Sequence, residues 1–141
     1  MKIKQISIFL ENKPGRIAEI TKILKEAKIN IRALSVADTS EFGILRIIVD
    51  NYEKAIAALK KNNYSASITD VIAVELDDRP GGLHDALVAL DKENLNVEYM
   101  YAFVSWEKKD KALIIFRIEN IEKAISVLLK AGFNIVSDIG S

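Results

Sequence analysis

Two short segments of the sequence share an unusual combination of residues, a Pro-Gly pair preceded by acidic or amide side chains. They are ENKPGRI at 11–17 and DDRPGGL at 77–83. Each lies where alternating apolar residues give way to apolar residues at helical spacing, which predicts a strand-to-helix turn. The free amides at a helix N-terminus attract a small anion such as a carboxylate. Four nearby side chains are polar enough to bind the ammonium group of an α-amino acid: Glu11, Asn12, Asp77 and Asp78.

The Pro-Gly pair suits the start of a helix. Proline at the first helical position has its φ angle already set and lacks an amide hydrogen that would be unpaired there. Glycine lets the backbone come close to a bound group. We therefore expect Pro14 and Pro80 at first helical positions, each followed by a glycine beneath a ligand. A single Pro-Gly pair is more often only a tight turn, but two at equivalent positions of a repeat favour a binding role.

The sequence contains an internal repeat. A shift of 66 positions places Pro14-Gly15 on Pro80-Gly81 and the segment INI at 29–31 on LNV at 95–97. Further along the chain the shift becomes 69, so the second copy is three residues longer, and the extra residues fall between positions 102 and 112. Two copies of about 70 residues predict two small domains, at 1–70 and 71–141.

Both copies show the same series of periodicities, strand, helix, two strands, helix and strand. The expected strands lie at 6–10, 29–37, 42–50, 65–76, 97–104, 112–119 and 133–139, and the expected helices at 17–27, 52–63, 83–92 and 121–130. The segment 65–76 serves both copies. The order βαββαβ is the ferredoxin-like plan, an α+β fold with two helices on one face of a four-stranded antiparallel sheet. The other face needs a cover, so we expect a homodimer.

Composition restricts the classes of function. The 141 residues include 20 Lys and Arg and 20 Asp and Glu, and this zero net charge argues against nucleic acid or a membrane surface as the main partner. There is no cysteine, and no nucleophile with a recognisable base is evident. No apolar run reaches the roughly 20 residues that span a bilayer. We therefore expect a cytoplasmic protein that is not an enzyme and holds no metal or cofactor.

The two segments resemble the motif of ACT domains, small ligand-sensing modules attached to many enzymes of amino-acid metabolism. That motif is a first strand, an Asn/Asp-x-Pro-Gly turn, and an asparagine between hydrophobic residues at the start of the second strand. NKPG at 12–15 with Asn30 and DRPG at 78–81 with Asn96 match it. The resemblance covers essentially all of the chain and is close to small stand-alone proteins made of two ACT domains.

The resemblance implies an amino-acid ligand bound in clefts between ACT domains, held by backbone amides of the turn and by the asparagine. Arg16 aligns with Gly82, so we expect the two sites to be unequal. Carried over by position, and with the acidic residue before the first turn included, the predicted ligand-binding residues are Glu11, Asn12, Pro14, Gly15, Arg16, Ile17, Asn30, Asp78, Pro80, Gly81, Gly82, Leu83 and Asn96.

Aromatic residues of the second copy leave other interpretations open. Tyr99, Tyr101 and Phe103 alternate on a predicted strand, as stacking residues do in RNA-recognition motifs. They lie on the second strand rather than on the first or third, so we favour packing at an interface. Trp106 either packs or anchors a partner.

An amino-acid sensor of this kind has to act through another protein. A partner enzyme of amino-acid metabolism is the natural candidate. The competing hypothesis is a ligand-independent docking or regulatory subunit of such an enzyme. In that case the residues of the two turns matter little and the surface near Trp106 matters more.

Overall fold

The alternating and helical segments of the sequence form two successive βαββαβ series. The computed structural model describes residues 1–38, 41–104 and 106–139. Strand β4 is a single strand of 13 residues that serves both series, as predicted. The elements follow the order β1 (Ile3–Glu11), α1 (Arg16–Glu26), β2 (Ile31–Asp38), β3 (Phe42–Val49), α2 (Tyr52–Lys61), β4 (Ser65–Asp77), α3 (Gly82–Lys92), β5 (Val97–Ala102), β6 (Lys111–Ile118), α4 (Ile121–Lys130) and β7 (Asn134–Val136).

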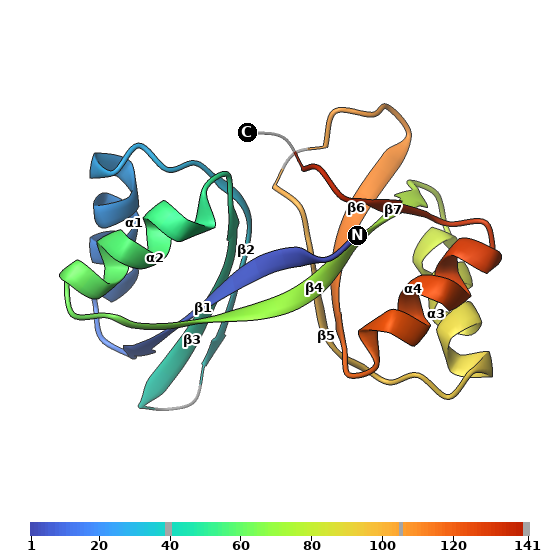
Figure 1. Ribbon diagram of the computed structural model, residues 1–141, viewed down its shortest axis with the longest axis horizontal. Helices are drawn as coiled ribbons and strands as arrows, with labels where there is room; N and C mark the ends of the chain where they lie inside the picture. Colours follow the sequence, from blue (N-terminus) through green and yellow to red (C-terminus); the bar gives the residue numbers. More distant parts are fainter. Residues whose placement is uncertain (39–40, 105, 140–141) are drawn as a thin grey trace. The chain divides into compact units, whose positions relative to one another are not determined.

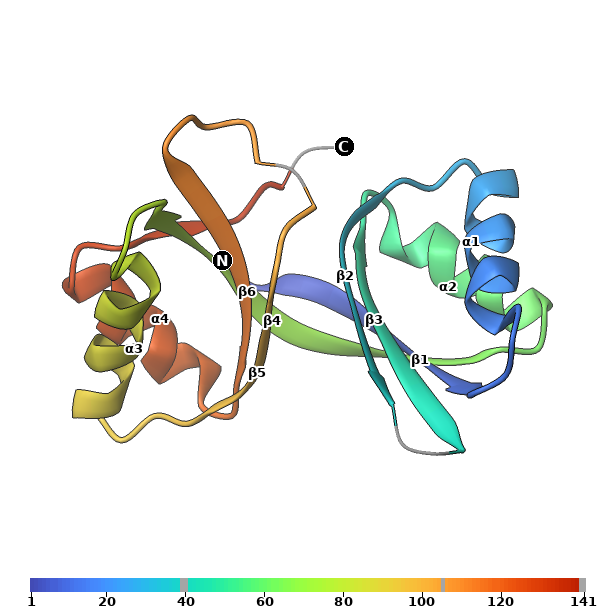
Figure 2. The same ribbon diagram turned by 180° about the vertical axis from the view of Figure 1, so that it is seen from behind.

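The first compact unit contains Lys4–Thr69 together with Ile139. Its strand order is β2-β3-β1 with β4 next to β1, and β3 pairs antiparallel with both β1 and β2. Helices α1 and α2 cover one face of these strands, as Figures 1 and 2 show from opposite sides. Ile6 lies opposite Ile47 and Ile8 opposite Leu45, so both strands turn their apolar side chains to the helices. The helices meet them with buried residues that include Ile20, Ile23, Leu24, Ala55 and Leu59.

The second compact unit consists of Asp70–Asp138 together with Met1–Ile3. Here β4 pairs with β6 on one side and with β7 on the other, and β5 pairs with β6, all antiparallel. Helices α3 and α4 cover one face (Figure 1). Its buried core includes Ile72, Val74, Leu76, Leu90, Phe116, Ile118 and Leu128. Both units therefore have the predicted ferredoxin-like plan.

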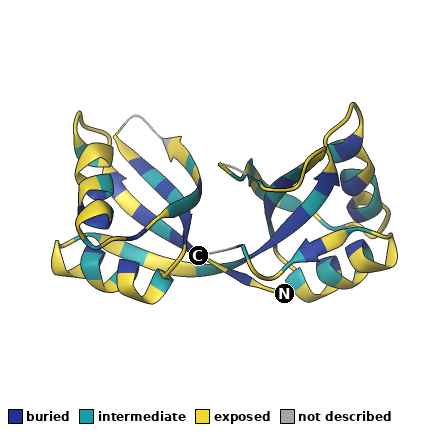
Figure 3. Cartoon of the chain, turned by 90° about the horizontal axis from the view of Figure 1, so that it is seen from above, coloured by how far each residue is buried: buried dark blue, intermediate teal, exposed yellow. Residues whose placement is uncertain are grey.

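Burial along the helices follows the predicted periodicity with one clear exception. Figure 3 shows buried residues where helices meet strands and exposed residues on the outer helix faces. Ile17, which lies at helical spacing from the buried Ile20 and Leu24, is instead 40% exposed. It lies at the very start of the helix, beyond the residues that pack on the sheet. None of the helices in the described parts has the length and apolar character needed to cross a membrane.

Two strands are shorter by two residues or more than their sequence periodicity predicts. Strand β5 ends at Ala102 rather than at 104, because only the Phe103 N–H, which donates to the Leu113 carbonyl at 3.0 Å, continues the pairing with β6. Strand β7 contains only Asn134–Val136 rather than 133–139, and it pairs with three residues of β4. Apolar alternation identifies residues that can form a strand. The strand itself ends where the neighbouring strand no longer pairs with it.

Candidate functional site

The first predicted site begins with a tight turn after β1, which we call the first turn (residues 12–15). The Arg16 N–H donates to the Lys13 carbonyl at 3.3 Å, so the bond encloses Pro14 and Gly15. Gly15 has φ 85° and ψ −9°. Proline followed by a residue with positive φ is the pattern of a type II turn, which favours glycine at that second position.

The second turn (residues 78–81) repeats this geometry after β4. The Gly82 N–H donates to the Arg79 carbonyl at 3.0 Å, and Gly81 has φ 89° and ψ −6°. The prediction that Pro14 and Pro80 occupy first helical positions is wrong, because each lies two residues before its helix begins. The glycine must take a positive φ to complete the turn, so it becomes the helix cap and the proline precedes it.

The glycines of the two turns have different physical roles. A Cβ atom added to Gly15 meets nothing within 4 Å in the described parts, so the positive φ alone favours glycine there. A Cβ atom added to Gly82 would lie 2.1 Å from the carbonyl oxygen of Asp77. Gly82 is buried and lets the start of α3 approach the end of β4. Leu83, the next residue, packs against the core of the second unit.

Helix caps distinguish the two turns from the other helix starts. Helices α2 and α4 are capped by asparagine side chains, since Asn51 accepts from the Lys54 N–H at 3.1 Å and Asn120 accepts from the Lys123 N–H at 3.3 Å. Helices α1 and α3 are capped by glycine, and the structure gives neither cap a side-chain hydrogen bond. Their first-turn amides are therefore not satisfied by a capping side chain.

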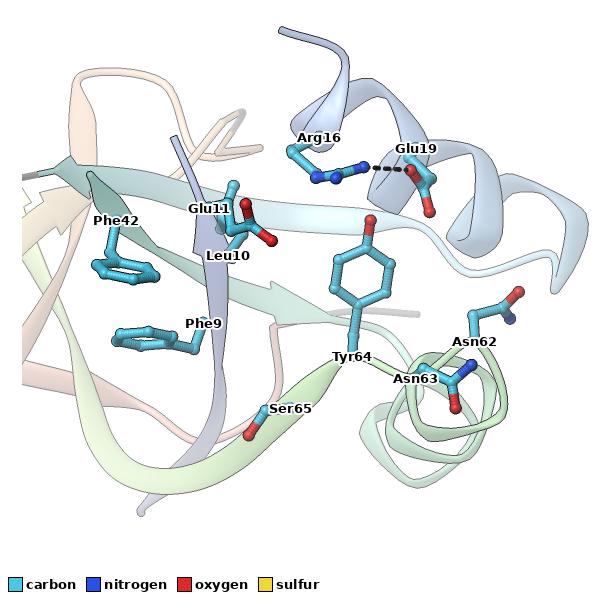
Figure 4. Close-up of a pocket in the computed structure, with 10 residues that line it drawn as sticks. All are labelled: Phe9, Leu10, Glu11, Arg16, Glu19, Phe42, Asn62, Asn63, Tyr64 and Ser65. Carbon is cyan, nitrogen blue, oxygen red and sulfur yellow. Dashed lines mark hydrogen bonds and ion pairs between the residues drawn. The ribbon is translucent and has the colours of Figure 1, made fainter. Parts of the chain in front are cut away.

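The first turn borders a hollow of about 340 Å³, which we call the first hollow. Its walls come from the ends of β1 and α2 and the starts of α1, β3 and β4 (Figure 4). Of the predicted residues, Glu11 and Arg16 line it. The other lining residues are not among our predictions: Phe9, Leu10, Glu19, Phe42, Asn62, Asn63, Tyr64 and Ser65.

Charged and hydroxyl groups gather on one side of the first hollow. The Arg16 guanidinium lies 3.4 Å from the Glu19 carboxylate, and the Tyr64 hydroxyl points toward these two side chains (Figure 4). Burial, followed by the hydrogen bond to Glu19, raises the pKa of Tyr64, so its hydroxyl keeps its proton at neutral pH. The hydrogen bond and the charge of Lys13, 2.8 Å away, lower the pKa of Glu11. This side can therefore meet both charges of a zwitterion.

Two aromatic rings form the other side of the first hollow. Phe9 and Phe42 stack with ring centroids 5.5 Å apart and an angle of 29° between the rings. They are 53% and 43% exposed, and Figure 4 shows them across β1 from Arg16. An exposed aromatic pair beside charged groups offers an apolar surface to part of a ligand.

The structure does not bring Asn30 to the turn of its own unit. The Asn30 N–H donates to the Asp50 carboxylate at 3.1 Å, just after the end of β3. By contrast, the Asn12 N–H donates to the Glu41 carbonyl at 2.9 Å, just before β3 begins. Strand β3 has 8 residues, so the two positions are separated by roughly 26 Å along it.

Asn96 has the corresponding place in the second unit. It precedes β5, whereas the Asp78 N–H donates to the Asp110 carbonyl just before β6, at the other end of that strand pair. Asn96 lines a separate hollow of about 440 Å³. The residues that line it with Asn96 are Glu93, Asn94, Leu95, Glu119, Asn120 and Lys123.

Ion pairs occupy the surroundings of the second turn. The Asp77 carboxylate accepts from Lys111, whose hydrogen bond and charge lower the pKa of this carboxyl. Arg79 lies 3.5 Å from Asp77 and 2.8 Å from Asp85. The hydrogen bond and the charge of Asp85 raise the pKa of Arg79.

Glu75, on β4 before the second turn, is held by the longer hairpin of the second unit. Its side chain is only 8% exposed, accepts from the Trp106 indole N–H at 3.1 Å and lies 3.2 Å from the Lys108 ammonium. Trp106 also packs edge-on against Phe103, with centroids 5.9 Å apart. Of the two roles left open for Trp106, the structure therefore shows packing.

The environment of Glu75 predicts an acid-sensitive contribution to stability. Burial acts to raise its pKa, but hydrogen bonds from Lys108, Trp106 and Asn134 outweigh burial and lower it below the ordinary 4.5. A lowered folded-state pKa stabilises the protein above the unfolded-state pKa, and this contribution disappears as the pH falls through the folded-state pKa. We expect the unfolding free energy of the wild type to exceed that of Glu75→Gln at neutral pH and the excess to shrink below pH 4.5. Urea titrations across this range measure the difference, and an excess independent of pH would contradict the assignment.

A family match decides the relationship of the chain to known proteins. Residues 1–140 match the protein family described as ACT domain pair. The chain belongs to this family. Its two units are therefore ACT units, and the turns described above are their characteristic Pro-Gly turns. No curated protein matches the chain.

Solved structures share the fold of this ACT domain pair. A protein of Bacteroides thetaiotaomicron is 40% identical with a TM-score of 0.91, covering 99% of this chain and 96% of that one. The ligand-free regulatory subunit of aspartate kinase from Thermus thermophilus is 18% identical with a TM-score of 0.68 and 92% coverage of both chains. The corresponding subunit from Thermus flavus is also 18% identical, with a TM-score of 0.63 and 91% coverage of both chains. At this level of identity, the TM-scores of these two subunits show a shared fold.

Proposed function

We propose that this ACT domain pair is a regulatory protein that binds a free α-amino acid. The observation that carries the proposal is the first hollow, where Arg16, Glu19 and Tyr64 lie beside the start of α1. A ligand carboxylate there can accept from the guanidinium and from helix amides that no side chain caps. Glu19 and Glu11 are positioned to bind its ammonium group. The family, whose modules sense small ligands, supports the same function.

We further propose that the complete site includes a second copy of the chain. The first turn and Asn30 lie at opposite ends of one unit, so one unit alone does not present both to the same ligand. An ACT unit of another copy can supply its asparagine to the turn, which gives a homodimer with the ligand at an interface. Sedimentation velocity with and without ligand tests this assembly, and a monomer under both conditions would contradict it.

A regulatory role requires that ligand binding is coupled to a second equilibrium of the protein. A ligand shifts an equilibrium only if it binds one arrangement of the domains or of a complex more tightly than another. We propose that the bound amino acid acts in this way on a partner protein, with an enzyme of amino-acid metabolism as the candidate. The chain itself would then catalyse no reaction.

A thermal-shift screen of the purified protein against the twenty amino acids tests ligand binding. A ligand at about 100 times its dissociation constant adds about 2.7 kcal/mol of apparent stability, which is easily seen as a higher melting temperature. Each amino acid that gives a shift is compared with its decarboxylated amine, which lacks the carboxylate, and with its deaminated acid, which lacks the ammonium group. Because the proposal requires both charged groups, we expect neither control to stabilise the protein.

Two results of this thermal-shift screen would contradict the proposal or part of it. A folded protein that none of the twenty amino acids stabilises would contradict the proposal and favour the ligand-independent docking subunit. Equal stabilisation by an amino acid and its decarboxylated amine would contradict the role given to Arg16 and the start of α1.

A further inference from the structure

We infer that ligand binding is confined to the first ACT unit, which takes one amino acid with an apolar side chain per copy of the chain. In the second ACT unit the equivalent space is closed by the chain's own side chains. The inference rests on the proposed function and assigns its site and the class of side chain. The turns of the two units have the same backbone conformation, so the side chains around them can be compared residue by residue.

The aromatic pair of the first hollow has no counterpart in the second unit. Glu11 pairs with Phe42 across β1 and β3, and the equivalent Asp77 pairs with Lys111 across β4 and β6. In the first unit the strand partner is therefore an exposed ring. In the second unit it is a cation that donates to the carboxylate of Asp77. The second unit therefore has an ion pair at the position where the first unit has an exposed apolar ring.

The other ring is replaced as well. Glu75 is the counterpart of Phe9 at the shift of 66 positions. It is nearly buried beneath Trp106 and Lys108 of the hairpin that is longer in the second copy. Phe9, by contrast, is 53% exposed. The additional length of the hairpin thus supplies side chains that cover this position.

The cationic side of the second turn is also occupied. Gly82 stands where the first unit has Arg16, so the second unit has no guanidinium at this position. The nearby Arg79 is held between two carboxylates, those of Asp85 at 2.8 Å and Asp77 at 3.5 Å. In the first unit, the contact between Arg16 and Glu19 is longer than the Arg79–Asp85 contact, at 3.4 Å. To pair with Arg79, a ligand carboxylate has to displace a carboxylate that is already paired there. At Arg16 it can form an ion pair beside the longer contact with Glu19.

The layout of the first hollow defines the class of ligand. Arg16, Glu19 and Tyr64 lie on one side of β1, and the stacked rings of Phe9 and Phe42 lie on the other (Figure 4). A zwitterionic head group fits the first side, and an apolar side chain fits the rings. The ligand class is therefore an α-amino acid with an aliphatic or aromatic side chain.

Calorimetric titration with L-leucine, L-isoleucine and L-phenylalanine tests the inference on the full-length protein. We expect one of them to bind at one molecule per chain. Arg16→Gly and Tyr64→Phe introduce the residues that the second unit has at these positions, and we expect each to weaken binding by about tenfold or more. Asp85→Ala is the control in the second unit, because it removes a carboxylate that pairs with Arg79 beside the second turn, and we expect it to leave the dissociation constant unchanged. Circular dichroism confirms that each variant is folded.

The outcomes separate the two proposals. Failure of all twenty amino acids to bind would overturn the proposed function and this inference together. Binding of two molecules per chain, or loss of binding in Asp85→Ala but not in Arg16→Gly and Tyr64→Phe, would overturn the confinement to the first unit while amino-acid binding stands. Binding of charged amino acids only would overturn the apolar class.

Discussion

Replacing Leu128 with alanine is expected to destabilise the second unit by about 2–5 kcal/mol, the usual cost of emptying a buried leucine site. Leu128 lies on α4, is completely buried and packs in the core that contains Phe116 and Leu90. The variant loses the transfer free energy of the removed atoms and leaves a cavity that its neighbours fill only in part. The single tryptophan, Trp106, belongs to the same unit, so its fluorescence in a urea titration follows the unfolding of this core.

The neighbouring residue supplies a matched control. Leu129 is on the same helix but is 41% exposed. Leu129→Ala makes the same chemical change with the same effect on helix propensity, and we expect it to cost less than about 1 kcal/mol because it leaves no buried cavity. Equal losses for the two variants would show that the packing of α4 differs from the structure.

The second large effect is expected for Gly82→Ala, at about 3 kcal/mol or more, because an added methyl group overpacks a fixed contact. The new Cβ atom would lie 2.1 Å from the Asp77 carbonyl oxygen, which belongs to the backbone and cannot rotate away. Either α3 shifts away from β4 or the second turn deforms. Urea unfolding followed by circular dichroism measures the loss.

Gly132→Ala separates this overlap from the general cost of replacing a glycine. Gly132 follows α4 in the same unit with φ 94°, and an added Cβ atom there meets nothing within 4 Å in the described parts. Only conformational strain opposes the substitution, so we expect a loss of about 1–2 kcal/mol. Gly82→Ala as stable as wild type would mean that the second turn adapts freely, and Gly82 would then have no packing role.

Much of the fold was predictable because it depends on local periodicity. Alternation at Ile6, Ile8 and Leu10 defined β1, and the repeat of Pro-Gly at a shift of 66 positions defined two equivalent βαββαβ series. Helix α4 has the predicted bounds, and Gly132 follows it with positive φ, as glycine commonly does after a helix. The errors lie at element boundaries, at Pro14, at Ile17 and at the ends of β5 and β7. There, turn geometry and the extent of strand pairing outweigh the periodicity of the sequence.

The candidate site was predictable only in part. Glu11 and Arg16 were found because they flank a motif that is contiguous in sequence. Tyr64, Asn62 and Asn63 come from the connection after α2, and Phe42 comes from β3, so no local pattern links them to the first turn. One signal was present, since Tyr64 aligns with Phe133 and only the tyrosine has a hydroxyl group.

The sequence by itself determined the family, the repeat, the order of the elements and the two Pro-Gly turns, since each of these depends on residue types at fixed spacings. The tertiary structure alone decided which side chains meet. It separated Asn30 from the first turn, because β3 carries them to opposite ends of a sheet. It also distinguished two turns of equal backbone conformation, because the strand partner beside the first turn is an exposed aromatic ring and the one beside the second turn is a lysine paired with Asp77.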